Sequence, residues 1–530
     1  MALAPDPFAE HVVARLLDFF DRRTQWHRTL WVIGNVLALR EIVELHSDDA
    51  VFPEVRISAR RELIPNLEGD VGLGSEVERQ HLNKLLGASA QLAARSHPIL
   101  QIARLAEQAE TGYLSRWADA IAAGPVSAGA ERAARYLAAH LLDRGLSRDH
   151  LHRWWLRWAT KEPDMYRLDE LLLRLDNDIS EGARPYTVIV FLEQFADFQQ
   201  YPEGFIAPGD LETRLIELGF DPAVVPTSAS SGAIEFQVEA LDPGAAVEKV
   251  SETLDAFTAR IEVGHKHGGN VREAFQAADE ALVEGVRSPI PLWHRRQVEI
   301  YEISRGKLLF APAGEAIDSA LELVSYLDRS APATAVAGAW AAVESTLKGP
   351  SSPRDAAGLA SSIATASYPR AELTALAKSR SKGMPTDYLA QSIWDAESNR
   401  QRAWLFAEWI RTGVTLDLHD RSEIAGLHRM EAIIADPATE LRAMRSHMLA
   451  TMQRLYRQRN LVMHGGRTDA VALRSTLRAA APIVGAAFDR IAHAFFVGKV
   501  DPLSFGAQAD LSLALVQPGE SDRLTSLLEK

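Results

Sequence analysis

Residues Arg457–Gly466 read "RQRNLVMHGG" and close a long, arginine-rich stretch. Upstream, Asp436 and Pro437 are typical of an N-cap and a first helical position. Apolar residues then recur with helical spacing at Leu441, Met444, Met448, Met452 and Leu455. The pattern therefore predicts one long helix that begins near Asp436 and runs to the glycine pair.

The next position of this apolar stripe is Arg459. We therefore expect Arg459 to extend the buried face, and Arg454 and Arg457, which lie off the stripe, to be exposed. A bare buried charge is very costly, so an arginine on such a face needs an anionic partner or a cavity. The alternative to a functional role is an Arg–carboxylate pair that holds two helices together.

Asn460 and His464 follow Arg459 on the same helix. In an unbroken helix His464 lies about 140° around the axis and about 7.5 Å along it from Arg459. Glycine is the usual residue at a left-handed helix stop, so Gly465 and Gly466 predict that the helix ends close to His464. With the imidazole free to turn back and a long arginine side chain, an Arg459–His464 pair is geometrically available.

Such a pair suits one kind of chemistry. Histidine exchanges protons near neutral pH, and the guanidinium of arginine is a permanent fork of donors for phosphate oxygens. Together they suit the cleavage of RNA by its own 2′-hydroxyl, which yields a 2′,3′-cyclic phosphate and a 5′-hydroxyl. The histidine removes the 2′ proton and the guanidinium stabilises charge on phosphate. No metal or other cofactor is required, and DNA lacks the nucleophile.

The segment "RNLVMHGG" resembles the R-x(4–6)-H motif of the HEPN superfamily of small all-helical domains, and the likeness covers about 311–500. It also resembles the ApeA-like branch found in bacterial anti-phage proteins. The resemblance implies that Arg459 and His464 are the catalytic pair with Asn460 supporting, and that the domain forms a homodimer in which two motifs face each other. It also implies an RNA-cleaving defence effector or toxin whose activity is controlled by a phage trigger or a regulatory partner.

Charge is distributed unevenly along the chain. The formal net charge is −14, but residues 441–480 contain eight arginines and a single acid, Asp469. The sequence predicts that this region, including Arg454, Arg457 and Arg467, contacts RNA phosphates. The alternative is a solvated face paired with acids elsewhere. Glu344, at the edge of an apolar stripe, is a candidate to orient Arg459 or His464, or an exposed acid.

The 530 residues predict several domains and a mainly α fold. We expect an N-terminal helical region (1–182), a small α/β domain (183–310), a HEPN-like helical domain (311–500) and a C-terminal appendage (501–530). Strands are predicted at 186–193, 233–241 and 297–304, and residues 51–65 also show strand character.

Several classes of protein are excluded or disfavoured. The chain has no cysteine, so it has no disulfide and no thiolate site. It has no P-loop, H-E-x-x-H or G-x-S-x-G motif. No signal peptide or membrane span is visible, so we expect a cytoplasmic protein. The favoured function is a metal-independent endoribonuclease; the alternatives are a non-catalytic HEPN scaffold that binds RNA or a partner, and a structural helical subunit.

Overall fold

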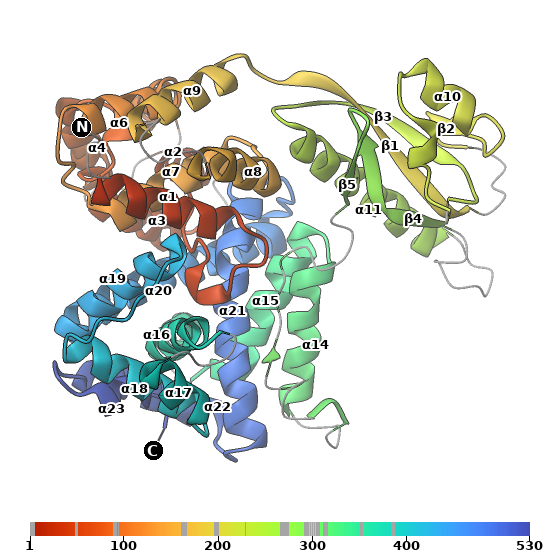
Figure 1. Cartoon of the computed structure of the whole chain (residues 1–530). Coiled ribbons are helices and arrows are strands. Elements are labelled where there is room, and N and C mark those ends of the chain that lie inside the picture. The colour runs from red at the N-terminus through yellow and green to blue at the C-terminus, as the bar shows by residue number, and fades with distance from the viewer. Residues whose placement is uncertain are drawn as a thin grey trace, which may run out of the picture.

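The computed structural model shows a helical body with a small sheet unit at one side (Figure 1). It describes residues 6–47, 51–87, 93, 95–160, 167–195, 201–227, 229–264, 275–290, 296, 298, 300, 301, 303, 308–310, 316–349, 353–382 and 387–529. The fold is mainly α, as the sequence predicts, with one antiparallel sheet.

The first part of the chain is helical. Its elements are α1 (Pro7–Phe20), η1 (Trp26–Arg28), α2 (Asn35–Ser47), α3 (Pro53–Leu67), η2 (Val71–Leu73), α4 (Glu76–Gly87), α5 (His97–Glu110), α6 (Tyr113–Ala122), α7 (Ala130–Asp143), α8 (Arg148–Ala159) and α9 (Leu168–Ser180). The strand character expected in 51–65 is wrong, because Pro53 occupies the first turn of α3. Val55, Ala59, Leu63 and Leu67 recur every four residues and bury one helical face.

A five-stranded antiparallel sheet follows, in the order β2-β3-β1-β4-β5. Its elements are β1 (Arg184–Phe195), β2 (Phe205–Ile206), α10 (Leu211–Glu217), η4 (Pro222–Val224), β3 (Ala233–Ala240), α11 (Pro243–Gly264), β4 (Phe275–Val283) and β5 (Val286–Pro289). The central strand β1 is buried on both faces: Val188 and Val190 pack in the cluster that contains α11, and Ile189 and Phe191 in the cluster that contains α10.

The strand predicted at 297–304 is wrong. Among its described residues none is in a strand, and Val298 and Ile300 pack against the helical core instead of a sheet. The sheet takes β4 in its place. Because β4 carries Asp279 and Glu280 in its middle, its sequence lacks the clear alternation that marks a strand.

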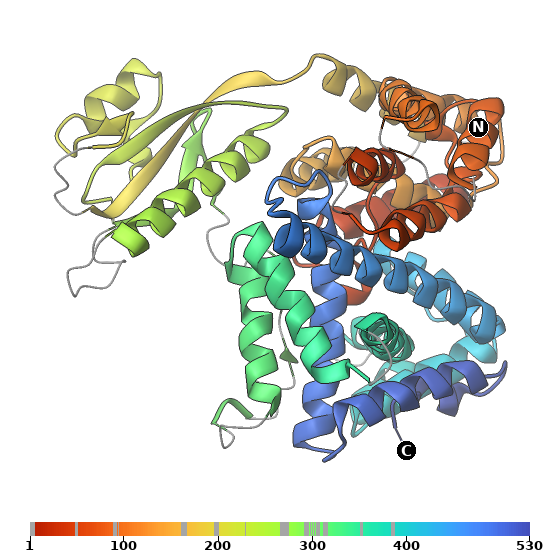
Figure 2. The ribbon, with the colours of Figure 1, turned by 180° about the vertical axis from the view of Figure 1, so that it is seen from behind.

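The C-terminal part is helical again (Figure 2). Its elements are η5 (Leu308–Phe310), α14 (Ala316–Arg329), α15 (Pro332–Leu347), α16 (Pro353–Arg380), α17 (Tyr388–Asp395), α18 (Asn399–Arg411), α19 (Arg421–Ala435), α20 (Pro437–Gly465), α21 (Leu473–Phe496), α22 (Pro502–Leu515) and α23 (Ser521–Thr525). Helix α16 lies at the centre and packs against α18, α20, α21 and α22. Among the described helices, none is long and apolar enough to cross a membrane.

One hydrophobic core joins the two helical parts. It contains Leu39 and Trp117 of the first part together with Trp340 and Phe488 of the last. Residues 501–530 contribute to it as well, because Phe505 of α22 is buried there. The first and last thirds of the chain therefore pack as one helical body.

Candidate active site

Helix α20 begins and ends where the sequence predicts. The Asp436 side chain accepts a hydrogen bond from the backbone N–H of Thr439 at 3.1 Å, and Pro437 is the first helical residue. At the other end Gly466 has φ +62°, the left-handed conformation that glycine adopts at no steric cost. The backbone N–H groups of Gly466 and Arg467 donate to carbonyls of the last turn. The helix therefore continues through His464 and stops immediately after it.

Arg459 and His464 meet at this helix end. The Nη1 atom of Arg459 lies 3.3 Å from Nε2 of His464 and donates to Oδ1 of Asn460 at 3.0 Å. Arg459 is half-buried and His464 is exposed. The helix does not unwind to bring them together; the arginine side chain spans the separation along the helix. The two groups predicted as a pair thus share one environment that solvent reaches.

This geometry fixes what the two side chains can do. An arginine is always charged and only donates, so its contact with His464 needs a lone pair on Nε2 and places the ring proton on Nδ1. A neutral imidazole beside a guanidinium can take a proton close to a bound anion once its Nε2 lone pair is released from Arg459. Asn460 holds the guanidinium in place, because its amide oxygen accepts a hydrogen bond from Nη1 of Arg459.

The prediction that Arg454 and Arg457 are exposed is wrong. Both are buried, and they pair with Glu41 of α2 and Glu62 of α3. Arg454 Nε lies 3.0 Å from Glu41, and Arg457 Nη2 lies 2.7 Å from Glu62. Burial alone would raise the pKa of Glu41, but the charges of Arg457 and Arg454 lower it. These two arginines hold α20 against the N-terminal helices, and they are not available to RNA.

Most arginines of the whole 441–480 segment pair with acids. Of its eight arginines, the six with carboxylate partners are Arg445, Arg454, Arg457, Arg467, Arg474 and Arg478. Arg467, predicted to bind RNA, lies 2.7 Å from Glu44 and 3.2 Å from Asp469, and is partly exposed. Within the described part of the chain, Arg459 contacts only Asn460 and His464 by hydrogen bonds.

Glu344 does not touch the pair. In the described structure it accepts a hydrogen bond from Trp340 Nε1 at 3.1 Å and lies 3.5 Å from Lys348 Nζ. The Trp340 ring packs against Tyr456 of α20, with ring centroids 4.8 Å apart. Glu344 therefore reaches α20 through two aromatic rings and contacts neither Arg459 nor His464.

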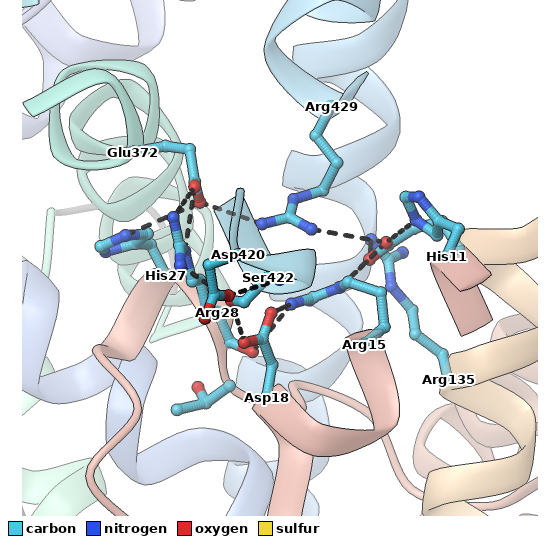
Figure 3. Close-up of polar contacts among 12 residues, drawn as sticks. His11, Arg15, Asp18, His27, Arg28, Arg135, Glu372, Asp420, Ser422 and Arg429 are labelled. Carbon is cyan, nitrogen blue, oxygen red and sulfur yellow. Dashed lines mark hydrogen bonds and ion pairs between the residues drawn. The ribbon is translucent and has the colours of Figure 1, made fainter. Parts of the chain in front are cut away.

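A buried ion network that the sequence does not reveal joins α1 and η1 to α16 and α19 (Figure 3). Its centre is Glu372, which is fully buried and lies 2.7 Å from Arg28 Nη2 and 3.1 Å from Arg429 Nη2. Burial alone would raise the pKa of Glu372, but Arg429 and Arg28 lower it well below its usual range. No local pattern marks this network, since Arg28 and Glu372 are 344 positions apart.

His27 lies beside this network and is also buried. Its Nε2 atom is 3.6 Å from Glu372, and neither ring nitrogen has a hydrogen-bond partner among the described atoms. Burial lowers the pKa of His27 to about 3, although the nearby Glu372 raises it. His27 is therefore neutral near pH 7, and the network fastens the two helical parts together.

Comparisons with models of protein families, with curated proteins and with solved structures found no match. Within the described ranges, no three His, Asp or Glu side chains are grouped so that they could hold a metal ion.

Proposed function

We propose that this protein is a metal-independent endoribonuclease of the HEPN type, with Arg459 and His464 as its catalytic pair. The observation that carries the proposal is the 3.3 Å contact between Arg459 Nη1 and His464 Nε2 at the exposed end of α20. A base and a permanent cation at one solvent-facing point are what cleavage of a phosphodiester by a neighbouring hydroxyl requires.

The proposed reaction assigns one role to each residue. His464 takes the proton of the ribose 2′-hydroxyl, O2′ attacks the adjacent phosphorus, and the bond from phosphorus to O5′ breaks. Arg459 stabilises the charge on the non-bridging oxygens, while Asn460 holds its guanidinium. The leaving O5′ takes up a proton from water or from a second histidine. If the protein is a homodimer through this domain, that histidine is supplied by the other copy.

The biological setting follows by analogy with the family that the motif resembles. A ribonuclease that was always active would damage its own cell. We therefore propose a cytoplasmic effector of anti-phage defence, restrained until a phage or regulatory trigger appears.

Purified wild type, His464→Ala, Arg459→Ala and the control Arg442→Ala test the proposal. Arg442 is an exposed arginine on the same helix, far from its C-terminal end. Each protein is incubated with cellular RNA in EDTA, and cleavage rates are compared. Loss of the base should slow cleavage by about 10²–10⁴-fold, and loss of the guanidinium by about 10²–10³-fold, while the control keeps the wild-type rate. RNA binding without cleavage in every protein would favour the non-catalytic scaffold.

A further inference from the structure

A large groove opens where the two helical parts meet the sheet unit. Residues of η1, α8, α11, α16 and α21 line it, and its volume is about 1520 Å³. Pockets for single small ligands are usually about 300–1,000 Å³. The groove is thus large enough for an extended ligand that contacts all three parts of the chain.

The lining of this groove is strongly basic. Its described residues include eleven arginines and lysines against five aspartates and glutamates, a net charge of +6. The whole chain has a net charge of −14. Six of the arginines pair with carboxylates: Arg22, Arg370, Arg400, Arg474, Arg478 and Arg490. A concave surface with an excess of one sign of charge concentrates the opposite charge, so the groove attracts anions that the rest of the molecule repels.

Two arginines in the groove are not fully satisfied. The Nε atoms of Arg148 and Arg478 are buried and have no hydrogen-bond partner among the described atoms. Among the described residues, Arg148 donates only to the carbonyl oxygens of Phe19 and Asp21, at 3.1 and 2.9 Å. Burial, Arg22 and Arg478 lower the pKa of Arg148 to about 10, while Asp149 and Asp21 raise it. An anionic ligand could accept a hydrogen bond from the unpartnered Nε of Arg148.

Aromatic rings lie among these cations. Trp26 and Tyr301 line the groove, and 43% of Tyr301 is exposed. Cationic grooves with aromatic platforms are typical of sites for single-stranded nucleic acid, because phosphates meet the cations while unpaired bases stack on the rings. A double helix cannot offer its bases in this way.

We propose that this groove binds single-stranded RNA, with its phosphates on the arginines and its bases on the aromatic rings. Val471, in the short connection between α20 and α21, lines the groove, so the site lies close along the chain to the helix end that carries His464. The choice of RNA as the ligand rests on the proposed function. The groove itself is separate from Arg459 and His464, neither of which lines it.

The test measures binding, so it does not depend on cleavage. Full-length protein carrying His464→Ala is titrated with a labelled 20-nucleotide oligouridine at several salt concentrations. The groove variant adds Arg23→Glu and Lys249→Glu, two exposed cations that line the groove and form no ion pair among the described residues. The control adds Lys84→Glu and Arg157→Glu, which are also exposed but lie outside it. A third variant, Tyr301→Ala, removes an aromatic platform.

The groove variant should bind the oligouridine at least about tenfold more weakly than the parent. Its slope of log Kd against log salt should be smaller by about 1.4, which is about 0.7 for each lost phosphate contact. Tyr301→Ala should weaken binding about fivefold or more. The control should bind as the parent does. Equal binding by the groove variant and the control, or tighter binding of double-stranded RNA of the same length, would overturn the proposal. Either result leaves the cleavage test above unaffected.

Discussion

The pairing of α20 with the N-terminal helices makes a sharp prediction for Glu41→Gln. Glu41 is 1% exposed, lies 3.0 Å from Arg454 and 3.5 Å from Arg457, and accepts from Gln458 at 2.9 Å. The substitution keeps the volume of the side chain and removes its charge. Two buried guanidiniums are then left with Glu62 as their carboxylate partner.

The size of the effect follows from these contacts. Removing one partner of a buried ion pair costs about 3–5 kcal/mol. Because Glu62 still contacts both arginines, we expect the lower end, about 3 kcal/mol. Urea unfolding followed by circular dichroism, with hydrogen exchange of the α20 amides, measures the loss. The matched control is Glu54→Gln, since Glu54 is an exposed glutamate on α3 and should change the free energy of unfolding by less than about 0.5 kcal/mol.

The same variant should alter the dependence of stability on pH. The pKa of Glu41 is lower in the folded than in the unfolded chain, so its contribution is complete above about pH 4.3 and is lost as the pH falls through the folded value. Glu41→Gln should therefore lose less stability than wild type on acidification from neutral pH. If Glu41→Gln is as stable as the Glu54→Gln control, the two buried arginines do not depend on Glu41 and this account of how α20 is held fails.

Two further predictions concern other parts of the helical body. Gly466→Ala should lower the free energy of unfolding by about 1 kcal/mol, because a left-handed alanine is strained even where no neighbour lies within 4 Å. Gly465→Ala, inside the helix, should leave the stability unchanged or raise it. Thermal unfolding of both variants tests this, and equal effects would refute the left-handed helix stop at Gly466. Between pH 6.5 and 4, the His27→Gln variant should lose less stability than the wild type. The folded pKa of about 3 lies below the unfolded value, so wild type loses stability as the pH falls below 6.5. Stability curves against pH test this, with His81→Gln, an exposed histidine, as the control; parallel curves for wild type and His27→Gln would contradict it.

The sequence predicted local features of the fold well and long-range ones poorly. The bounds of α20 follow from Asp436, Pro437 and Gly466, which act on their own neighbours through capping and backbone geometry. The burial of Arg454 depends on Glu41, which lies 413 positions away. An arginine off the apolar stripe is normally exposed, and the sequence around Arg454 does not indicate that a carboxylate on another helix pairs with it.

The candidate site shows the same division. Contact between Arg459 and His464 was predictable because both lie within one helix end of known geometry. The partners of Glu344 were only partly predictable: Trp340 and Lys348 lie on its own helix or at its end, but Tyr456 comes from α20. The basic groove could not be predicted, because its cations come from α8, α11, α16, α18, α21 and the connecting segments, which are spread over most of the chain and share no motif.

The most direct test of the proposed function is the chemistry of the RNA ends. A defined oligonucleotide is incubated with wild-type protein in EDTA, and its products are analysed by mass spectrometry beside the same oligonucleotide with 2′-O-methyl groups. We predict fragments that end in a 2′,3′-cyclic phosphate and begin with a 5′-hydroxyl, and no cleavage of the methylated strand or by His464→Ala. Products with 5′-phosphates, or cleavage of the methylated strand, would contradict attack by the 2′-hydroxyl at Arg459 and His464.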